Sequence, residues 1–109
     1  MTLIELNFYE GKEDLILHGQ ACATTRRTRH GKEGDVFVVR GQTYQITQVL
    51  CMTLEEVARL YYREEGYSSP DVFYAVWQMC YKGQQDTRLN QRVYLHKFRP
   101  YLTVHCMLC

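Results

Sequence analysis

Apolar and polar residues alternate along the first stretch of the chain, from Leu3 to Tyr9, and the even-numbered positions are the apolar ones. This period of two predicts a half-buried strand. Apolar residues then cluster within residues 12–18, which predicts a short helix. Gly19 follows at the place where a left-handed residue commonly closes a helix, so we expect the helix to end there.

Two apolar runs joined by a short turn predict a β-hairpin in the middle of the chain. Val36–Val39 is continuously apolar, as in a strand that is buried on both faces. The tripeptide at residues 40–42 contains a glycine and indicates a tight reversal. A second strand is expected over residues 43–50, with its apolar side chains gathered on one face.

Two capping signals predict two helices after the hairpin. Thr53-Leu-Glu-Glu56 is a capping box, and apolar residues follow it at helical spacing as far as Tyr61, with Gly66 expected to end the helix. Ser69-Pro70 then places a capping hydroxyl before a proline at the first helical position. We expect this second helix to stop by Gly83. Its apolar face, which we assign to the core, consists of Val72, Phe73, Val76, Trp77 and Cys80.

The order of these elements predicts the fold class. A last strand is expected over Val93–Phe98, interrupted by Pro100, and residues 102–108 would form a further strand or an apolar tail. The chain lacks both the alternation of strands and helices that builds a doubly wound sheet and the glycine-rich pattern of a phosphate-binding loop. We therefore expect one α+β domain over residues 1–109, a small mixed β-barrel flanked by two to three helices.

Composition narrows the class of protein but not its function. The 109 residues carry 13 Lys and Arg against 12 Asp and Glu, so no overall charge draws the chain to nucleic acid or to membranes. The apolar runs are far shorter than the ~20 residues of a bilayer span, and the N-terminal residues do not resemble a signal peptide. We expect a cytoplasmic protein that does not bind membranes; the sequence leaves open whether it is a monomer or a weak dimer.

The five cysteines cannot all pair, and no export signal accompanies them, so we expect reduced thiols. Cys106 and Cys109 have a metal-like spacing, with His105 beside them, and His18 lies four residues before Cys22. A structural zinc site usually needs a second close pair of ligands, and two small apolar side chains packed in a tail explain the spacing without a metal. We expect no metal and no other cofactor.

A basic segment from Thr24 to Lys32 is the most distinctive local feature. Arg26, Arg27, Arg29 and Lys32 place four unit charges within seven residues, with threonine hydroxyls among them and small residues before them. Guanidinium forks and hydroxyls bind phosphate or carbonyl oxygens, and small residues let a ligand approach the backbone. A solvated basic loop without a ligand has the same composition, so composition alone leaves both interpretations open.

Several short motifs, taken in order, resemble the ASCH domain family. They are Leu17-His-Gly19, Thr24-x-Arg26, Gly31-x-x-Gly34-Asp35, a valine-rich strand, and Glu65-Gly66-Tyr67 ahead of a helix with Phe73 and Trp77. The resemblance extends from the first predicted helix to the strand that ends at Phe98. It implies a PUA-like fold, which is a small twisted β-barrel flanked by helices. It also implies binding of RNA or a modified nucleotide in a cleft beside the barrel.

One branch of that family hydrolyses the amide of N-acetylated cytidine nucleosides and resembles the pattern G-x-K-x-x-T-x-R with a distal glutamate. Gly19, Thr24, Arg26 and Glu65 match this pattern, which implies Thr24 as nucleophile and Arg26 as support for the oxyanion. Ala21 occupies the lysine position, and a methyl group cannot take the proton of a threonine hydroxyl. The residues that could supply a base from elsewhere in the fold are Lys12, Lys32, Lys82 and His18.

Three hypotheses follow. The first is a module that binds RNA or a nucleotide against Thr24–Lys32, with Glu65 opposite and Tyr67 stacked on a base. The second is an amidohydrolase in which Thr24 and Glu65 are catalytic. The third is an interaction or regulatory domain without nucleic acid, whose apolar tail at residues 101–109 docks on a partner chain. The predicted ligand-binding residues are Gly19, Thr24, Arg26, Arg27, Arg29, Lys32, Glu65 and Tyr67.

Overall fold

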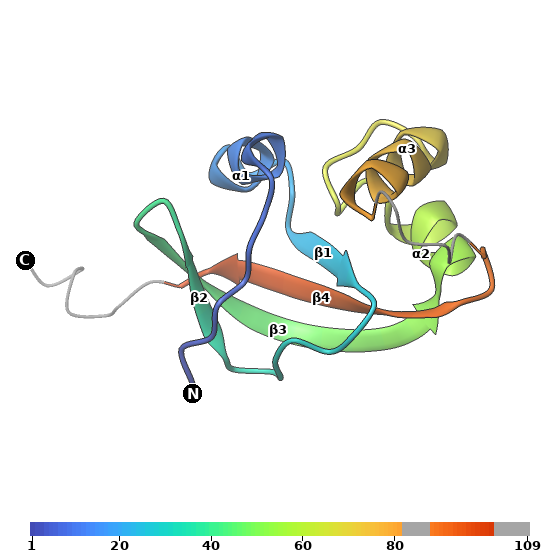
Figure 1. Cartoon of the computed structure of the whole chain (residues 1–109). Coiled ribbons are helices and arrows are strands. Elements are labelled where there is room, and N and C mark those ends of the chain that lie inside the picture. The colour runs from blue at the N-terminus through green and yellow to red at the C-terminus, as the bar shows by residue number, and fades with distance from the viewer. Residues whose placement is uncertain (82–87, 102–109) are drawn as a thin grey trace, which may run out of the picture.

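Four antiparallel strands form one curled sheet, and three helices pack against it (Figure 1). The structure is a computed structural model that describes residues 1–81 and 88–101. The elements in chain order are α1 (Glu10–Leu17), β1 (Ala23–Arg26), β2 (Val36–Val39), β3 (Gln42–Thr53), α2 (Leu54–Tyr61), α3 (Pro70–Cys80) and β4 (Arg92–Pro100). The strand order in the sheet is β1-β4-β3-β2. The predicted small α+β architecture is therefore confirmed.

The N-terminal segment differs from the predicted strand. Its alternation of buried and exposed side chains is as expected, because Leu6 is buried while Leu3 is exposed. The backbone, however, pairs with β2 only at its start, where the Ile4 amide donates to the Val36 carbonyl over 2.8 Å. Beyond that point no strand in the described part of the chain pairs with residues 5–9, so the segment crosses the sheet as an extended strap that leads into α1 (Figure 1).

The hairpin forms as predicted, with two corrections. Arg40 and Gly41 both have positive φ, 46° and 83°, which is the backbone of the two-residue turn that suits a hairpin twist. Strand β2 is not buried on both faces, since Val38 is 47% exposed. Strand β3 runs on to Thr53 with a bulge between Ile46 and Gln48. The extra residue at the bulge reverses which side chains face which side of the sheet, so one apolar face does not extend along the whole strand.

Both predicted caps are present. The Thr53 hydroxyl accepts from the Glu56 amide, and the Glu56 carboxylate accepts from the Thr53 amide, which completes the capping box of α2. Ser69 caps α3 through the Val72 amide, with Pro70 in the first turn. Helix α2 ends at Tyr61, earlier than expected, and a turn follows it up to Gly66, whose φ is +93°.

Two apolar clusters form the core, on opposite faces of the sheet. In β4, Phe98 packs with the cluster that contains Phe37, Ile46 and the α1 residue Ile16. Val93 and Leu95, which point the other way along the same strand, pack with a second cluster. The members of this second cluster that α2 and α3 contribute are Leu54, Val57, Ala58, Phe73 and Trp77.

Some predictions fall outside the described residues. Gly83, the tail at 102–109 and the Cys106/Cys109 pair lie there, so the tail hypothesis and the helix stop stay predictions. Pro100 closes β4 rather than interrupting it, with Tyr44 as its register partner. Within residues 1–81 and 88–101, no helix is long and apolar enough to cross a membrane, and no cluster of three potential metal ligands occurs.

His96 is buried, with 0% of its surface exposed, beneath the loop that follows β1. The His30 amide donates to His96 Nε2 over 3.1 Å, so this nitrogen is an acceptor and carries no proton. The neutral ring then holds its proton at Nδ1, which lies 3.1 Å from the Tyr94 carbonyl and donates to it. Burial, aided by the charges of His30 and Arg26, lowers the pKa of His96 to about 4.

Acid should therefore destabilise the fold through His96. Histidine has a reference pKa of 6.5, against about 4 in the folded chain, so between these values only the unfolded chain binds the proton. The stabilisation is complete above about pH 6.5 and is lost as pH falls toward about 4. His96→Gln removes this dependence. Urea denaturation gives the unfolding free energy of each protein. Relative to the variant, the unfolding free energy of wild type should fall by on the order of 2–3 kcal/mol from about pH 7 to about pH 4.

His18→Gln is the matched control, because His18 lies exposed at the end of α1. This variant leaves the buried His96 ring in place, so it should keep the loss of stability in acid that His96→Gln removes. If the difference between wild type and His96→Gln does not change with pH, the role assigned to the buried ring is wrong.

Candidate functional site

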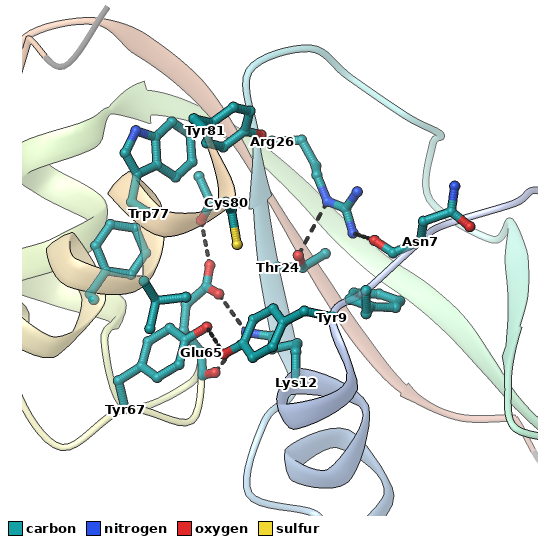
Figure 2. A pocket seen from close by; sticks show the side chains of 14 residues that line it. Asn7, Tyr9, Lys12, Thr24, Arg26, Glu65, Tyr67, Trp77, Cys80 and Tyr81 are labelled. Atoms are coloured by element: carbon teal, nitrogen blue, oxygen red, sulfur yellow. Dashed lines mark hydrogen bonds and ion pairs between the residues drawn. The ribbon is translucent and has the colours of Figure 1, made fainter. Parts of the chain in front are cut away.

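A pocket of about 270 Å³ opens at the free edge of β1. It lies between the N-terminal strap, the start of α1, strand β1, the turn that follows α2, and α3 (Figure 2). These segments are far apart in the sequence. The lining residues are Asn7, Phe8, Tyr9, Lys12, Thr24, Thr25, Arg26, Glu65, Tyr67, Phe73, Val76, Trp77, Cys80 and Tyr81.

A buried ion pair forms one wall of the pocket. Lys12, in the first turn of α1, and Glu65, in the turn after α2, are each 3% exposed. Lys12 Nζ lies 2.6 Å from Glu65 Oε1 and also donates to the Glu65 backbone carbonyl over 2.7 Å. A desolvated amine and carboxylate are tolerated only when they are paired and hydrogen-bonded, and both conditions hold. The pair fixes the turn against α1.

Two adjacent threonines reach the pocket from opposite faces of the edge strand. The Thr25 hydroxyl donates to Glu65 Oε2, so the carboxylate is held by Lys12 on one oxygen and by Thr25 on the other. Thr24, buried at 5% exposed, points to the other face, where it accepts a long 3.4 Å hydrogen bond from Arg26 Nε. Because β1 is an edge strand, side chains from both faces border the same hollow.

Arg26 lies at the rim, held by uncharged groups. Its Nη2 donates to the Asn7 carbonyl of the strap over 2.7 Å, and its guanidinium lies 4.9 Å from the centre of the Phe8 ring. Burial lowers the pKa of Arg26, and nearby Glu65 acts against that shift. Arginine nevertheless stays charged in proteins. The rim therefore carries a fixed positive charge.

Aromatic side chains form much of the remaining wall. Tyr9 and Tyr67 meet across the pocket with their hydroxyl oxygens 3.0 Å apart, and the Lys12 ammonium lies 4.8 Å from the centre of the Tyr67 ring. Burial and the bond to Tyr9 raise the pKa of Tyr67, so its hydroxyl is neutral. Trp77 and Tyr81 lie with ring centres 4.3 Å apart on the opposite wall (Figure 2). Such surfaces suit a flat aromatic ligand.

The structure brings together only some of the residues predicted for the site. Thr24, Arg26, Glu65 and Tyr67 line the pocket, whereas Gly19, Arg27, Arg29 and Lys32 do not. Gly19 closes α1 with a φ of +75°. Arg27 lies over the Tyr81 ring at 4.3 Å. Arg29 and Lys32 are exposed in the loop after β1.

A lysine lines the pocket, but it comes from α1 and not from position 21. Ala21 is buried at 3% exposed and does not line the pocket. Lys12, one of the residues that could replace the missing amine, does line it. A sequence signal existed, because Lys12 lies four residues before the buried Ile16 and therefore on the same face of the helix. A lysine on a buried face needs a partner.

Sequence reasoning missed four other polar residues of the pocket. Thr25 was part of the basic segment but was not singled out, because no strand was predicted over residues 23–26 and no sequence pattern indicated that both hydroxyls lie at one site. Asn7 and Tyr9 belong to the strap, which was expected to be an ordinary strand. Cys80 was assigned to the core but lines the pocket, with a thiol pKa that burial raises.

Comparison with known proteins supports the fold of this chain but does not identify its function. The sequence matches no model of a known protein family, and no curated protein is detectably similar to it. Solved structures do match. Hypothetical protein PH0355 is 16% identical with a TM-score of 0.70, over 93% of this chain and 100% of that one. An ASCH domain from Lactobacillus crispatus JV V101 is 18% identical with a TM-score of 0.65, over 91% and 79%.

A third structure, of protein PF0455 from Pyrococcus furiosus, is 16% identical with a TM-score of 0.64 and covers 91% of this chain and 97% of that one. The three matches extend over nearly the whole chain and not over a single motif. Together with the curled four-stranded sheet and its three helices, they show that this chain has the small α+β, PUA-like fold of an ASCH domain.

Proposed function

We propose that the chain is a nucleotide- or RNA-binding module that takes one base into the pocket at the edge of β1. The observation that carries this proposal is the meeting of Arg26, Thr24 and the Glu65 carboxylate with aromatic walls in one hollow. At about 270 Å³, the hollow lies just below the range of about 300–1,000 Å³ that drug-sized ligands occupy. It suits a single base or nucleoside and not a length of strand.

The chemistry of the walls fits a base. A flat ring packs against the faces of tyrosine and tryptophan side chains with little dependence on its identity. Hydrogen bonds to its edge would then give selectivity, and a carboxylate such as Glu65 accepts from an exocyclic amino group. Lys12 and the neutral hydroxyls of Thr24 and Tyr67 add donors on the same walls.

Two exposed basic residues outside the pocket have a separate role in this proposal. Arg29 and Lys32, in the loop after β1, would contact phosphates of an RNA strand that continues beyond the bound base. Such contacts add affinity without reading sequence, and they weaken with salt. Because they do not line the pocket, they would distinguish RNA from a free nucleotide as the ligand.

Binding should depend on the pocket arginine for every ligand and on the loop arginine only for RNA. Arg26→Ala should lower the affinity for mononucleotides and for short single-stranded RNAs by about tenfold or more, because it removes a charged hydrogen-bond donor from the site. Arg29→Ala should lower only the affinity for RNA and reduce its salt slope by about 0.7. Calorimetric titration measures both, and the indole NMR signal of Trp77, the single tryptophan, reports whether the pocket is occupied.

Arg59→Ala provides the matched control, because Arg59 is an exposed arginine on α2 outside the pocket. This variant should bind like wild type. The proposal fails if no RNA or nucleotide binds at low salt, or if binding leaves the Trp77 signal unmoved.

A second candidate function is hydrolysis of the amide of an N-acetylated cytidine nucleoside. The observation that favours it is the buried amine of Lys12, which shares the pocket with the Thr24 hydroxyl although Ala21 supplies none. In this candidate the Thr24 oxygen attacks the acyl carbon, the nucleoside amine leaves with a proton, and water releases the acyl group from the threonine. Arg26 would stabilise the oxyanion, and Glu65 would accept a proton.

The test is the release of cytidine from N4-acetylcytidine, measured by chromatography. Thr24→Ala should reduce turnover by at least about 100-fold, since it removes the nucleophile. Thr25→Ala is the variant for comparison, because it removes the neighbouring hydroxyl that donates to Glu65. Its effect should be smaller than that of Thr24→Ala. Absence of turnover by wild type, or turnover that persists in Thr24→Ala, rejects the hydrolase.

A further inference from the structure

The charges that line the pocket do not cancel. Three of its lining residues carry full charges: Lys12, Arg26 and Glu65. Lys12 and Glu65 neutralise one another at 2.6 Å, deep in the wall. Within residues 1–81 and 88–101, no carboxylate forms an ion pair with Arg26. The described residues that line the pocket therefore carry one positive charge in excess, located at its rim.

The partners of Arg26 leave part of its guanidinium group available. Nη2 donates to the Asn7 carbonyl and Nε to the Thr24 hydroxyl, and both acceptors are neutral. No described residue accepts from Nη1. The Phe8 ring beneath the guanidinium and the partial burial of the side chain strip water from this charge, and among the described residues no carboxylate lies within ion-pair distance of it. A cation in such a setting is stabilised by an anionic ligand that accepts from its free edge.

We propose that the ligand of this pocket carries a phosphate group that binds Arg26, so that the ligand class is a nucleoside monophosphate unit and not a neutral nucleoside. This inference rests on the proposed nucleotide-binding function and adds the position of the anion. The base packs among the aromatic walls near Glu65, and the phosphate lies at the rim where Arg26 meets the strap. One unbalanced charge calls for one anionic group, so further phosphates gain no partner within the pocket.

The Lys12 ammonium is a less suitable anion site. It already donates twice to Glu65, and a phosphate brought to it would lie beside the Glu65 carboxylate. Like charges at such a distance repel strongly where water is excluded. In this arrangement Arg26 at the rim binds the phosphate, and the buried pair of Lys12 and Glu65 in the wall faces the base.

The test compares each of the four common ribonucleosides with its 5′- and 3′-monophosphate in calorimetric titrations of the full chain. At least one monophosphate should bind wild type about tenfold or more tightly than its nucleoside, the ratio expected for hydrogen bonds to a charged group. In Arg26→Gln this ratio should fall to about one, because the glutamine amide carries no charge to pair with the phosphate. Arg26→Lys, which keeps the charge but not the fork, should retain part of the ratio.

Arg59→Gln is the control variant and should keep the full wild-type ratio. If nucleosides bind as tightly as monophosphates, the phosphate position is wrong while the nucleotide-binding function stands. If the ratio persists in Arg26→Gln, the anion binds elsewhere and the inference is also overturned. If neither nucleosides nor monophosphates bind, the proposed function fails and this inference fails with it. Thermal unfolding of each variant verifies that the fold is retained.

Discussion

The buried pair of Lys12 and Glu65 is the contact on which the pocket depends. Its two residues come from α1 and from the turn after α2, which are 53 positions apart. The pair joins them where water cannot replace either partner. Loss of one member of such a pair leaves an uncompensated buried charge, a cost of about 3–5 kcal/mol. Because the lysine also holds the Glu65 backbone carbonyl, the path of the turn and the position of Tyr67 follow from the same contact.

The edge position of β1 explains why this pair lies at a pocket and not inside a closed core. A central strand would have hydrogen-bonded neighbours on both sides, whereas β1 pairs with β4 alone among the strands that the structure describes. The strap and α1 approach the open side without forming a ladder, and Asn7 gives its carbonyl to the Arg26 side chain instead of to a strand. Thr24 and Thr25, on opposite faces of the strand, therefore reach one hollow. The strap that lies beside β1 without pairing with it therefore leaves the sheet edge open and creates the pocket.

Structural features that depend on neighbouring residues, such as helix caps and turns, could be predicted from the sequence. Contacts between distant segments could not. The capping box at Thr53, the cap at Ser69 and the two-residue hairpin turn are local, and each appears in the structure. The strap was mistaken for a strand because alternation reports which side chains are buried, not whether a partner strand lies alongside. The bulge in β3 left no signal in the sequence pattern. Thr24 and Arg26 entered the analysis through the basic segment and Glu65 through the resemblance, while the contact of Lys12 with Glu65 required the fold.

The state of that lysine also bears on the choice between recognition and hydrolysis. While Lys12 is paired with Glu65, it is a donor and cannot take a proton from a hydroxyl. The acceptor next to a hydroxyl is Glu65 itself, and the hydroxyl that it holds belongs to Thr25, not to Thr24. Hydrolysis through Thr24 would require a ligand to rearrange this cluster. We therefore propose the nucleotide-binding module ahead of the hydrolase.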